Sequence, residues 1–160
     1  MATDYILELD GIKGESTDKQ FKGHIDIESF TWGISNSGNM SAGGGGGAGK
    51  ASFSDVSFSK NVDLSSPKLA YHCASGAHIK KATLHVRKQG KDQKEYYTIT
   101  LEDLIVSSFQ SSGSNGNPIL HESFSLNFTK IKFVYKEQKA DGSLGTAPEF
   151  SYDVKQNVAK

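Results

Sequence analysis

The glycine-rich stretch at residues 44–50 comes closest in its spacing to a known chemical motif. Gly44, Gly46 and Gly49 match the G-x-G-x-x-G spacing, and the stretch matches a phosphate loop until Ala51 replaces the required Ser or Thr. Both motifs bind phosphate through the N–H groups of a helix that begins directly after the glycines. An alternating, strand-like segment follows here instead. We therefore expect an interaction arm and no nucleotide site.

Serine and lysine could form a nucleophile and its base where they are spaced as Ser-x-x-Lys. This spacing occurs at Ser16/Lys19, Ser57/Lys60 and Ser65/Lys68. The last pair lies at an expected helix start, as serine acyl-transferases require, but the companion Ser-Asp-Asn and Lys-Thr-Gly motifs are absent, as is a Gly-x-Ser-x-Gly elbow. We interpret Ser65 and Ser66 as helix caps. The alternative hypothesis is an enzyme of the Ser-Lys type, and it predicts that an acylating probe labels Ser65.

Histidines and carboxylates also show no pattern typical of a chemical site. The histidines are scattered, at His24, His72, His78, His85 and His121. His72, Cys73 and His78 are close in sequence, but a zinc site needs three or four converging ligands and no fourth candidate is evident. Carboxylates near turns, such as Asp10 and Asp26, show no paired acid and base arrangement. We expect no catalytic residue, metal or cofactor.

The elements that carry these residues are almost all strands. Alternating apolar residues predict strands near residues 5–9, 25–34, 50–62, 82–86, 97–106, 124–135 and 150–154. In the second of them, the apolar phase of Ile25 and Ile27 slips by one residue before Phe30, Trp32 and Ile34, which suggests a β-bulge. We expect a Ser/Gly/Asn loop over residues 107–117.

One short helix is predicted between the third and fourth strands. Ser66 provides a hydroxyl N-cap, Pro67 occupies the first helical position and Gly76 ends the helix. A helix of two to three turns is too short to be stable alone, so it must pack on the sheets.

A long glycine-rich loop joins the second and third strands. Gly43–Gly47 and Gly49 cannot form a packed helix or sheet interior, because glycine loses the most backbone freedom on folding and buries no side chain. So long a connection is usually either disordered or a functional binding loop.

Composition supports a single β-rich domain over residues 1–160. The chain is 36% hydrophobic, with 9 Phe, 6 Tyr and 17 Gly, which favours strands and turns. We predict a mainly β fold in which two curved antiparallel sheets close into a barrel, with one short α-helix and the long glycine-rich loop.

Charge and cysteine content exclude several classes of protein. The net charge is zero, from 18 basic and 18 acidic residues. Arg87 is the lone arginine and there is no dense basic run, so we expect no nucleic-acid partner. We find no signal peptide or apolar stretch of membrane-spanning length, and expect no membrane insertion. Cys73 has no second cysteine to pair with, which fits folding in a reducing cytosol.

A set of short motifs, spread in order over nearly the whole chain, resembles the haemolysin-coregulated protein (Hcp) family of the bacterial type VI secretion system. The motifs are Asp10–Asp18, Ser29–Ser35, Gly43–Lys50, Ser65–Leu69, Cys73–His78, Arg87–Lys88, Val106–Ser108, Leu126–Phe128 and Lys139–Gly142. Each motif is weak, but the combination is specific. The departures from the family pattern fall in loops, near residues 89–93 and 111–118.

The resemblance implies a homohexameric ring of barrel-shaped subunits, without catalysis. Rings stack into a tube inside a contractile sheath and behind a spike, and the ring lumen carries and chaperones small secreted effectors. The protein would be in the bacterial cytoplasm before firing. It would then reach the extracellular space or a target cell without a cleaved signal peptide.

Two groups of residues are candidate contact sites under this resemblance. Ser29 and Thr31 lie opposite Phe30 and Trp32 on the second strand, and could contact effectors in the lumen; alternatively they face solvent or a second core layer. The loop residues are assigned to contacts between subunits or rings, and the alternative is a disordered tip. They are Gly43, Gly44, Gly45, Gly46, Gly47, Gly49 and Lys50.

A second hypothesis is a monomeric β-barrel that binds a small ligand or carbohydrate. It predicts a monomer with a closed apolar pocket. The mass of the particle in solution separates this hypothesis from the ring.

Overall fold

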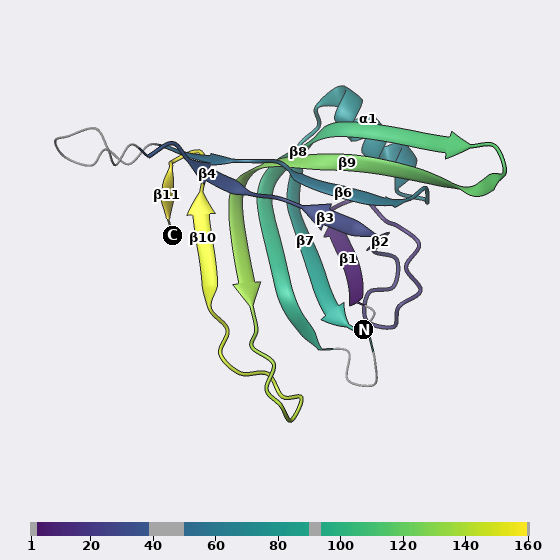
Figure 1. The fold of residues 1–160 in the computed structure, drawn as a ribbon. Helices are drawn as coiled ribbons and strands as arrows, with labels where there is room; N and C mark the ends of the chain where they lie inside the picture. Colours follow the sequence, from purple (N-terminus) through teal and green to yellow (C-terminus); the bar gives the residue numbers. More distant parts are fainter. Residues whose placement is uncertain (1–2, 39–49, 90–93, 160) are drawn as a thin grey trace.

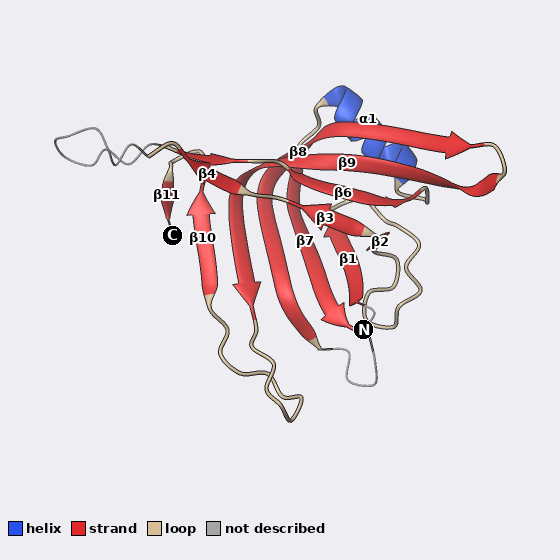
Figure 2. Ribbon diagram, viewed as in Figure 1, coloured by secondary structure: helices blue, strands red, loops and turns tan. Residues whose placement is uncertain are grey.

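A computed structural model describes residues 3–38, 50–89 and 94–159. Its strands and single helix follow one another along the chain as shown in Figures 1 and 2. They are β1 (Thr3–Leu9), β2 (Ile25–Ile27), β3 (Ser29–Thr31), β4 (Ile34–Asn36), β5 (Ala51–Phe53), β6 (Val56–Asn61), α1 (Ser66–Ser75), β7 (Ile79–Lys88), β8 (Glu95–Ser114), β9 (Asn117–Tyr135), β10 (Glu149–Asp153) and β11 (Val158–Ala159). The fold is therefore mainly β, with one short helix in the described part of the chain.

Nine strands of the described residues form one antiparallel sheet, which bends along the long hairpin of β8 and β9 into two parts (Figure 1). We call the part with β10, β7, β1 and β2 the wide sheet and the part with β6 and β3 the narrower sheet. The first half of β8 pairs with β7, and β9 ends beside β10, in the order β11-β10-β9-β8-β7-β1-β2. Beyond Leu104, β8 continues beside the first half of β9, which pairs with β6, and β6 pairs with β3. Asp103 lies next to Leu104, the point beyond which β8 no longer pairs with β7, and has a φ of 50°. Figure 1 shows the hairpin bending away from the wide sheet.

The expected barrel closure is not found in the ladders of the described residues. The strand order is an open path from β11 to β2, with β3 and β6 attached to one side through β9. The predicted slip is present, because the second strand breaks at Glu28 and changes partner from β1 to β6. The Glu28 N–H donates to the Ser59 carbonyl at 2.9 Å. The two sheets are thus joined here by the covalent chain.

Aromatic side chains fill the space between the two sheets. Phe30 of β3 lies 5.6 Å from Tyr5 of β1 and 5.6 Å from Tyr97 of β8, measured between ring centroids. Phe133 contacts Tyr97 at 4.7 Å, and Trp32 packs 5.9 Å from Phe133. Trp32 also donates an N–H hydrogen bond to the Tyr97 hydroxyl at 3.1 Å. Trp32 thus packs against the core, in keeping with its apolar phase in the sequence.

Helix α1 packs on β8 and begins at Ser66, one residue earlier than predicted. Ser65 is the N-cap by position, as expected, but its side chain makes no cap hydrogen bond. The prediction that Ser66 caps the helix is wrong, because Ser66 is the first helical residue. The Ser66 hydroxyl instead donates to buried Glu122 at 2.7 Å. Gly76 ends the helix with a φ of 69°, as expected of a left-handed C-cap. Leu69 is fully buried.

Two further expectations about the strands are wrong, and one strand was not predicted. The segment 107–117 is not a loop, because β8 continues to Ser114 and turns at Asn115 and Gly116 into β9. Cross-strand pairing with β9 outweighs the turn-like composition there. Ile34 is 45% exposed on β4 and does not join the core. Strand β11 was not expected. Among the described residues, no helix has the length and apolar character needed to cross a membrane.

Candidate functional site

A phenylalanine between two uncharged polar residues recurs on each of the strands that form the narrower sheet. The triplets are Ser29-Phe30-Thr31, Ser57-Phe58-Ser59, Ser108-Phe109-Gln110 and Ser123-Phe124-Ser125. The register aligns Phe30 with Phe58, Phe58 with Phe124, and Phe124 with Phe109. Because side chains alternate along a strand, the phenylalanines share the inner face and their neighbours share the outer one. Phe58 and Phe124 stack at 5.1 Å.

The polar neighbours form two rows across the outer face, which we call the hydroxyl face. One row is Ser29, Ser59, Ser123 and Gln110, and the other is Thr31, Ser57, Ser125 and Ser108. The hydroxyls of Ser29 and Ser59 are hydrogen-bonded to each other. Those of Ser108 and Ser125 lie 2.5 Å apart. Exposure differs across the face: the residues on β3 and β8 are exposed, those on β6 are half-buried, and on β9 Ser123 is half-buried and Ser125 buried. The polar groups open to a partner therefore lie mainly on β3 and β8.

Charge is confined to the two ends of the hydroxyl face. At one end, His121 lies 3.8 Å from Glu28 and both side chains are half-exposed. At the other end, Asp55 accepts hydrogen bonds from Ser107 at 2.6 Å and from Asn127 at 2.8 Å. The residues in the two central rows carry no charge. Such a surface can form hydrogen bonds but exerts little Coulombic attraction on a partner.

The alternation of side chains in the sequence predicted that Ser29 and Thr31 share one face. It did not identify the other members of the hydroxyl face. Ser29 and Thr31 are both exposed, on the side opposite Phe30. The residues missed are Ser57, Ser59, Ser108, Gln110, Ser123 and Ser125. The recurring triplet of polar, phenylalanine and polar residues was the signal that could have identified them. Lys50 is exposed next to β5, whereas Gly43–Gly47 and Gly49 lie outside the described residues.

A buried ion pair lies behind the hydroxyl face, under the start of α1. Lys60 and Glu122 have fully buried side chains that contact each other. The Lys60 ammonium also donates to Asp63 at 2.7 Å, and the Ser65 amide donates to Asp63 at 2.8 Å. Glu122 Oε2 is buried without a hydrogen-bond partner in the described part of the chain. This cluster joins β6 and β9 to the helix.

A second cluster surrounds Arg87 on β7. Its guanidinium is almost fully buried, contacts Asp18, and donates to Asp4 at 3.2 Å and to Gln20 at 3.1 Å. It also lies 5.2 Å from the centre of the Phe21 ring. The hydrogen bond from Arg87 lowers the pKa of Asp18 below its ordinary value, although burial opposes this shift. Arg87 therefore fastens the segment that precedes β2 onto the wide sheet.

A third cluster centres on His85, two residues before Arg87 on β7. Its Nδ1 lies 2.6 Å from Glu95 of β8, and its Nε2 lies 3.3 Å from Glu8 of β1. The Phe21 ring covers it at 4.6 Å. Burial disfavours the charged imidazole, but the hydrogen bonds and charges of Glu95 and Glu8 outweigh burial and raise the pKa of His85.

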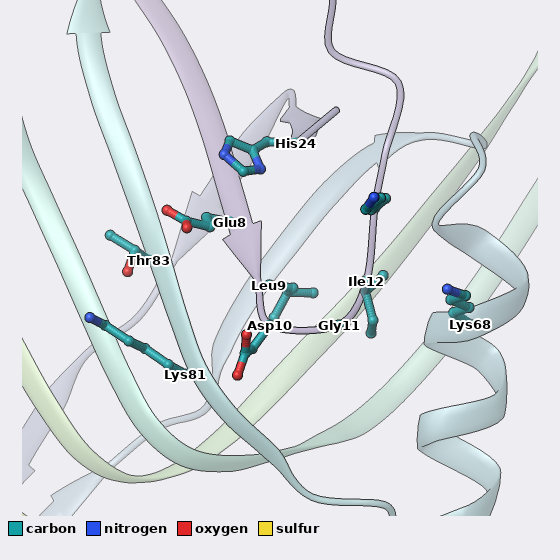
Figure 3. A pocket seen from close by; sticks show the side chains of 10 residues that line it. Glu8, Leu9, Asp10, Gly11, Ile12, His24, Lys68, Lys81 and Thr83 are labelled. Atoms are coloured by element: carbon teal, nitrogen blue, oxygen red, sulfur yellow. The ribbon is translucent and has the colours of Figure 1, made fainter. Parts of the chain in front are cut away.

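The pocket in Figure 3 lies where β1 ends, beside α1 and β7. It has a volume of about 280 Å³, and its lining mixes lysines with carboxylates and includes Glu8, Asp10, Lys68 and Lys81. It lacks the closed apolar character that the ligand-binding hypothesis expects. Among the described residues, no group of three or more His, Cys, Asp and Glu could hold a metal ion.

Fold and surface together define a β-sheet protein whose most regular exposed feature is a neutral, polar sheet face. Comparison with known proteins identifies its family. Residues 6–135 match the family model described as "Type VI secretion system effector, Hcp". The chain therefore belongs to the Hcp family, which confirms the resemblance inferred from the motifs. It is a structural, non-enzymatic type VI secretion protein, and the family is secreted.

Individual relatives match along their whole length. The chain is 43% identical over 160 residues to protein hcp1 of Pseudomonas aeruginosa, covering 99% of both proteins. It is 37% identical to the crystal structure of Hcp1 from Salmonella typhimurium, with a TM-score of 0.83 and complete coverage of both chains. A structure described as a type six secretion system protein is 28% identical, with a TM-score of 0.93, and the match covers 99% of this chain and 100% of that one.

Proposed function

We propose that this chain is the tube subunit of a type VI secretion system. Copies form hexameric rings, the rings stack, and the tube is expelled with the spike from within a contractile sheath. Before expulsion the tube is in the bacterial cytoplasm; afterwards it is in the extracellular space or a target cell. Family membership supports this proposal, and the unpaired edges of the narrower sheet carry it.

Both edges of the narrower sheet are open among the described residues. Beyond Leu104, β8 pairs with β9 alone, and β3 pairs with β6 alone. Open edges of this kind promote pairing with further chains unless they are covered. Neighbouring strands in the order β3, β6, β9, β8 are all antiparallel. A second copy placed with its β3 beside β8 therefore continues the alternation, and repeated rotation closes a ring.

We also propose that residues 1–160 form one domain whose two sheets close into a barrel. The break at Glu28 supports closure, because β2 and β3 are separated by this residue alone and pair with opposite sheets. The aromatic rings of Tyr5, Phe30 and Tyr97 pack across the enclosed space.

In the ring, the hydroxyl face lines the lumen and Ser29 and Thr31 contact small effectors. Its neutrality supports this role, because a lumen that carries different effectors must hold them without strong Coulombic attraction. The loop with Gly43–Gly47, Gly49 and Lys50 contacts neighbouring subunits or the next ring. The exposed position of Lys50, at the end of the arm formed by β4 and β5, is compatible with this assignment.

The mass of the particle tests the ring. Light scattering after size exclusion should give about six times the 17.3 kDa chain mass, with annular particles in negative stain. A monomer would overturn the proposal and favour a stand-alone binding module.

Deletion of Gly43–Gly47 tests the loop separately. We expect hexameric rings that no longer stack; loss of the rings themselves would assign the loop to contacts between subunits. If the deletion variant stacks as the parent protein does, the assignment of the loop is wrong.

A further inference from the structure

The arm formed by β4 and β5 stands apart from the rest of the fold. The two strands pair only with each other in the described part of the chain, where they form a separate two-stranded sheet. All three residues of β4 are exposed. A lone two-stranded hairpin is only marginally stable in water. The direction of the arm must therefore be fixed where it joins the body.

Backbone groups at the base of the arm hold its two strands together. The Gly33 N–H donates to the Ser54 hydroxyl at 2.8 Å. The Ser54 N–H donates in turn to the Gly33 carbonyl at 3.0 Å. These bonds join one strand of the arm to the other, but they do not orient the pair relative to the sheets.

The orienting contact is made by Phe53, the last residue of β5. Its ring lies 4.8 Å from that of Tyr152 on β10 and 6.2 Å, edge on, from that of Phe128 on β9. Phe128 is buried in the core. Phe53 therefore packs between a core residue and a residue of β10.

Tyr152 is itself held from several sides. Its backbone is in register with Ile131 of β9, its ring stacks 6.1 Å from that of Phe150, and its hydroxyl donates to the Asn157 side chain at 2.6 Å. A ring fixed in this way gives Phe53 a rigid surface. Strand β10 thus supports an arm that lies far from it in sequence.

We propose that Tyr152 is a positioning residue that sets the direction of the arm and thereby controls the stacking of rings. This inference rests on the proposed tube function. It separates two steps of assembly, because the edges of β3 and β8 that close a ring do not include β10 or the arm. Tyr152 acts through Phe53 and needs no contact of its own with the next ring.

Replacement of Tyr152 by Ala is the direct test, with Tyr152→Phe as the conservative variant and Tyr135→Ala as the control for loss of an exposed aromatic side chain. Tyr152→Ala should keep the mass of the ring but lower the association constant for stacking about tenfold, by loss of an aromatic contact. Sedimentation velocity over a range of ring concentrations measures stacking. Tyr152→Phe and Tyr135→Ala should stack as the parent protein does.

Hydrogen exchange shows whether the arm itself responds. In Tyr152→Ala the amides of residues 34–36 and 51–53 should exchange faster, and in Tyr135→Ala they should not. Unchanged exchange there, or faster exchange with unaltered stacking, overturns the inference. If Tyr152→Ala does not fold, Phe53→Leu removes the same contact from the other side and should give the same two results.

The parent protein separates failure of this inference from failure of the proposed function. A parent chain that forms no rings overturns the proposed function. A parent that forms rings but no stacks at any concentration overturns the stacking role on which the inference depends. Rings that stack equally well with Ala or Tyr at position 152 overturn the inference alone.

Discussion

The hydroxyl face and the three charged clusters use polar side chains in opposite ways. The hydroxyl face is made of short, neutral side chains that lie side by side on neighbouring strands. The clusters around Lys60, Arg87 and His85 are buried or half-buried and join segments that are far apart in sequence. The clusters therefore stabilise the fold, whereas the exposed residues of the hydroxyl face, on β3 and β8, are accessible to a partner.

The contrast is sharpest on β6, where the two kinds of residue alternate. Ser59 and Asn61 point to the side of the hydroxyl face, and Lys60 between them points inward to Glu122. Adjacent substitutions on one strand should consequently differ greatly in their effect on stability.

The largest effect is expected for Lys60→Met. It leaves the Glu122 carboxylate buried without its cation, and breaking a buried ion pair from one side costs about 3–5 kcal/mol. The free energy of unfolding from urea denaturation measures the loss.

The double variant Lys60→Met, Glu122→Leu is the matched control. It removes both charges and should recover most of the lost stability, because well-packed apolar residues often replace a buried pair without cost. A single variant as stable as the parent protein would contradict the assignment of this pair to the fold.

The next largest effect is expected for Arg87→Gln, which removes the partner of Asp18. We expect a loss of about 2 kcal/mol near neutral pH, typical of a hydrogen bond between charged groups. Because Arg87 lowers the pKa of Asp18, this stabilisation is present above the unfolded value of about 3.9 and is lost as the pH falls through the folded one. The difference in the free energy of unfolding between parent and variant should stay constant down to about pH 4 and shrink only as the pH falls further, through the lowered pKa of Asp18. The control is Lys88→Ala, at an exposed neighbouring residue. Its free energy of unfolding should follow that of the parent protein at every pH.

A smaller and oppositely directed effect is expected for His85→Gln. The pKa of His85 is raised, so its contribution is complete below about 6.5, the unfolded value, and is lost as the pH rises through the folded one. The melting temperature of the parent should exceed that of the variant more at about pH 5.5 than at about pH 8.5. Exposed His78→Gln is the control. An equal difference at both pH values would show that Glu95 and Glu8 do not stabilise a charged His85.

The sequence predicted elements whose signals are local. The alternation in β1 and β7, and the proline and glycine at the ends of α1, were enough to predict these elements. The end of β8 could not be predicted in this way. Serine and glycine favour turns there, and only pairing with β9 makes the segment a strand.

The charged clusters were also beyond prediction from the sequence, for a different reason. Lys60 and Glu122 are far apart along the chain, and neither residue has a local feature that indicates burial. Ser66 illustrates the consequence, since its hydroxyl was expected to cap the helix but binds Glu122 instead. For Ser29 and Thr31 the alternation of side chains predicted a shared, exposed side, and their contact with effectors stays a prediction.

The smallest effect on stability, and the most informative about function, is expected for the double variant Ser29→Ala, Thr31→Val. Both residues are exposed, and removal of two surface hydroxyls should change the free energy of unfolding by no more than about 0.5 kcal/mol. The ring should keep its mass. If the hydroxyl face holds cargo by hydrogen bonds, the amount of a co-expressed small effector that purifies with the ring should nevertheless fall. An unchanged amount, with folding and ring mass intact, would mean that these two hydroxyls do not contribute to cargo binding.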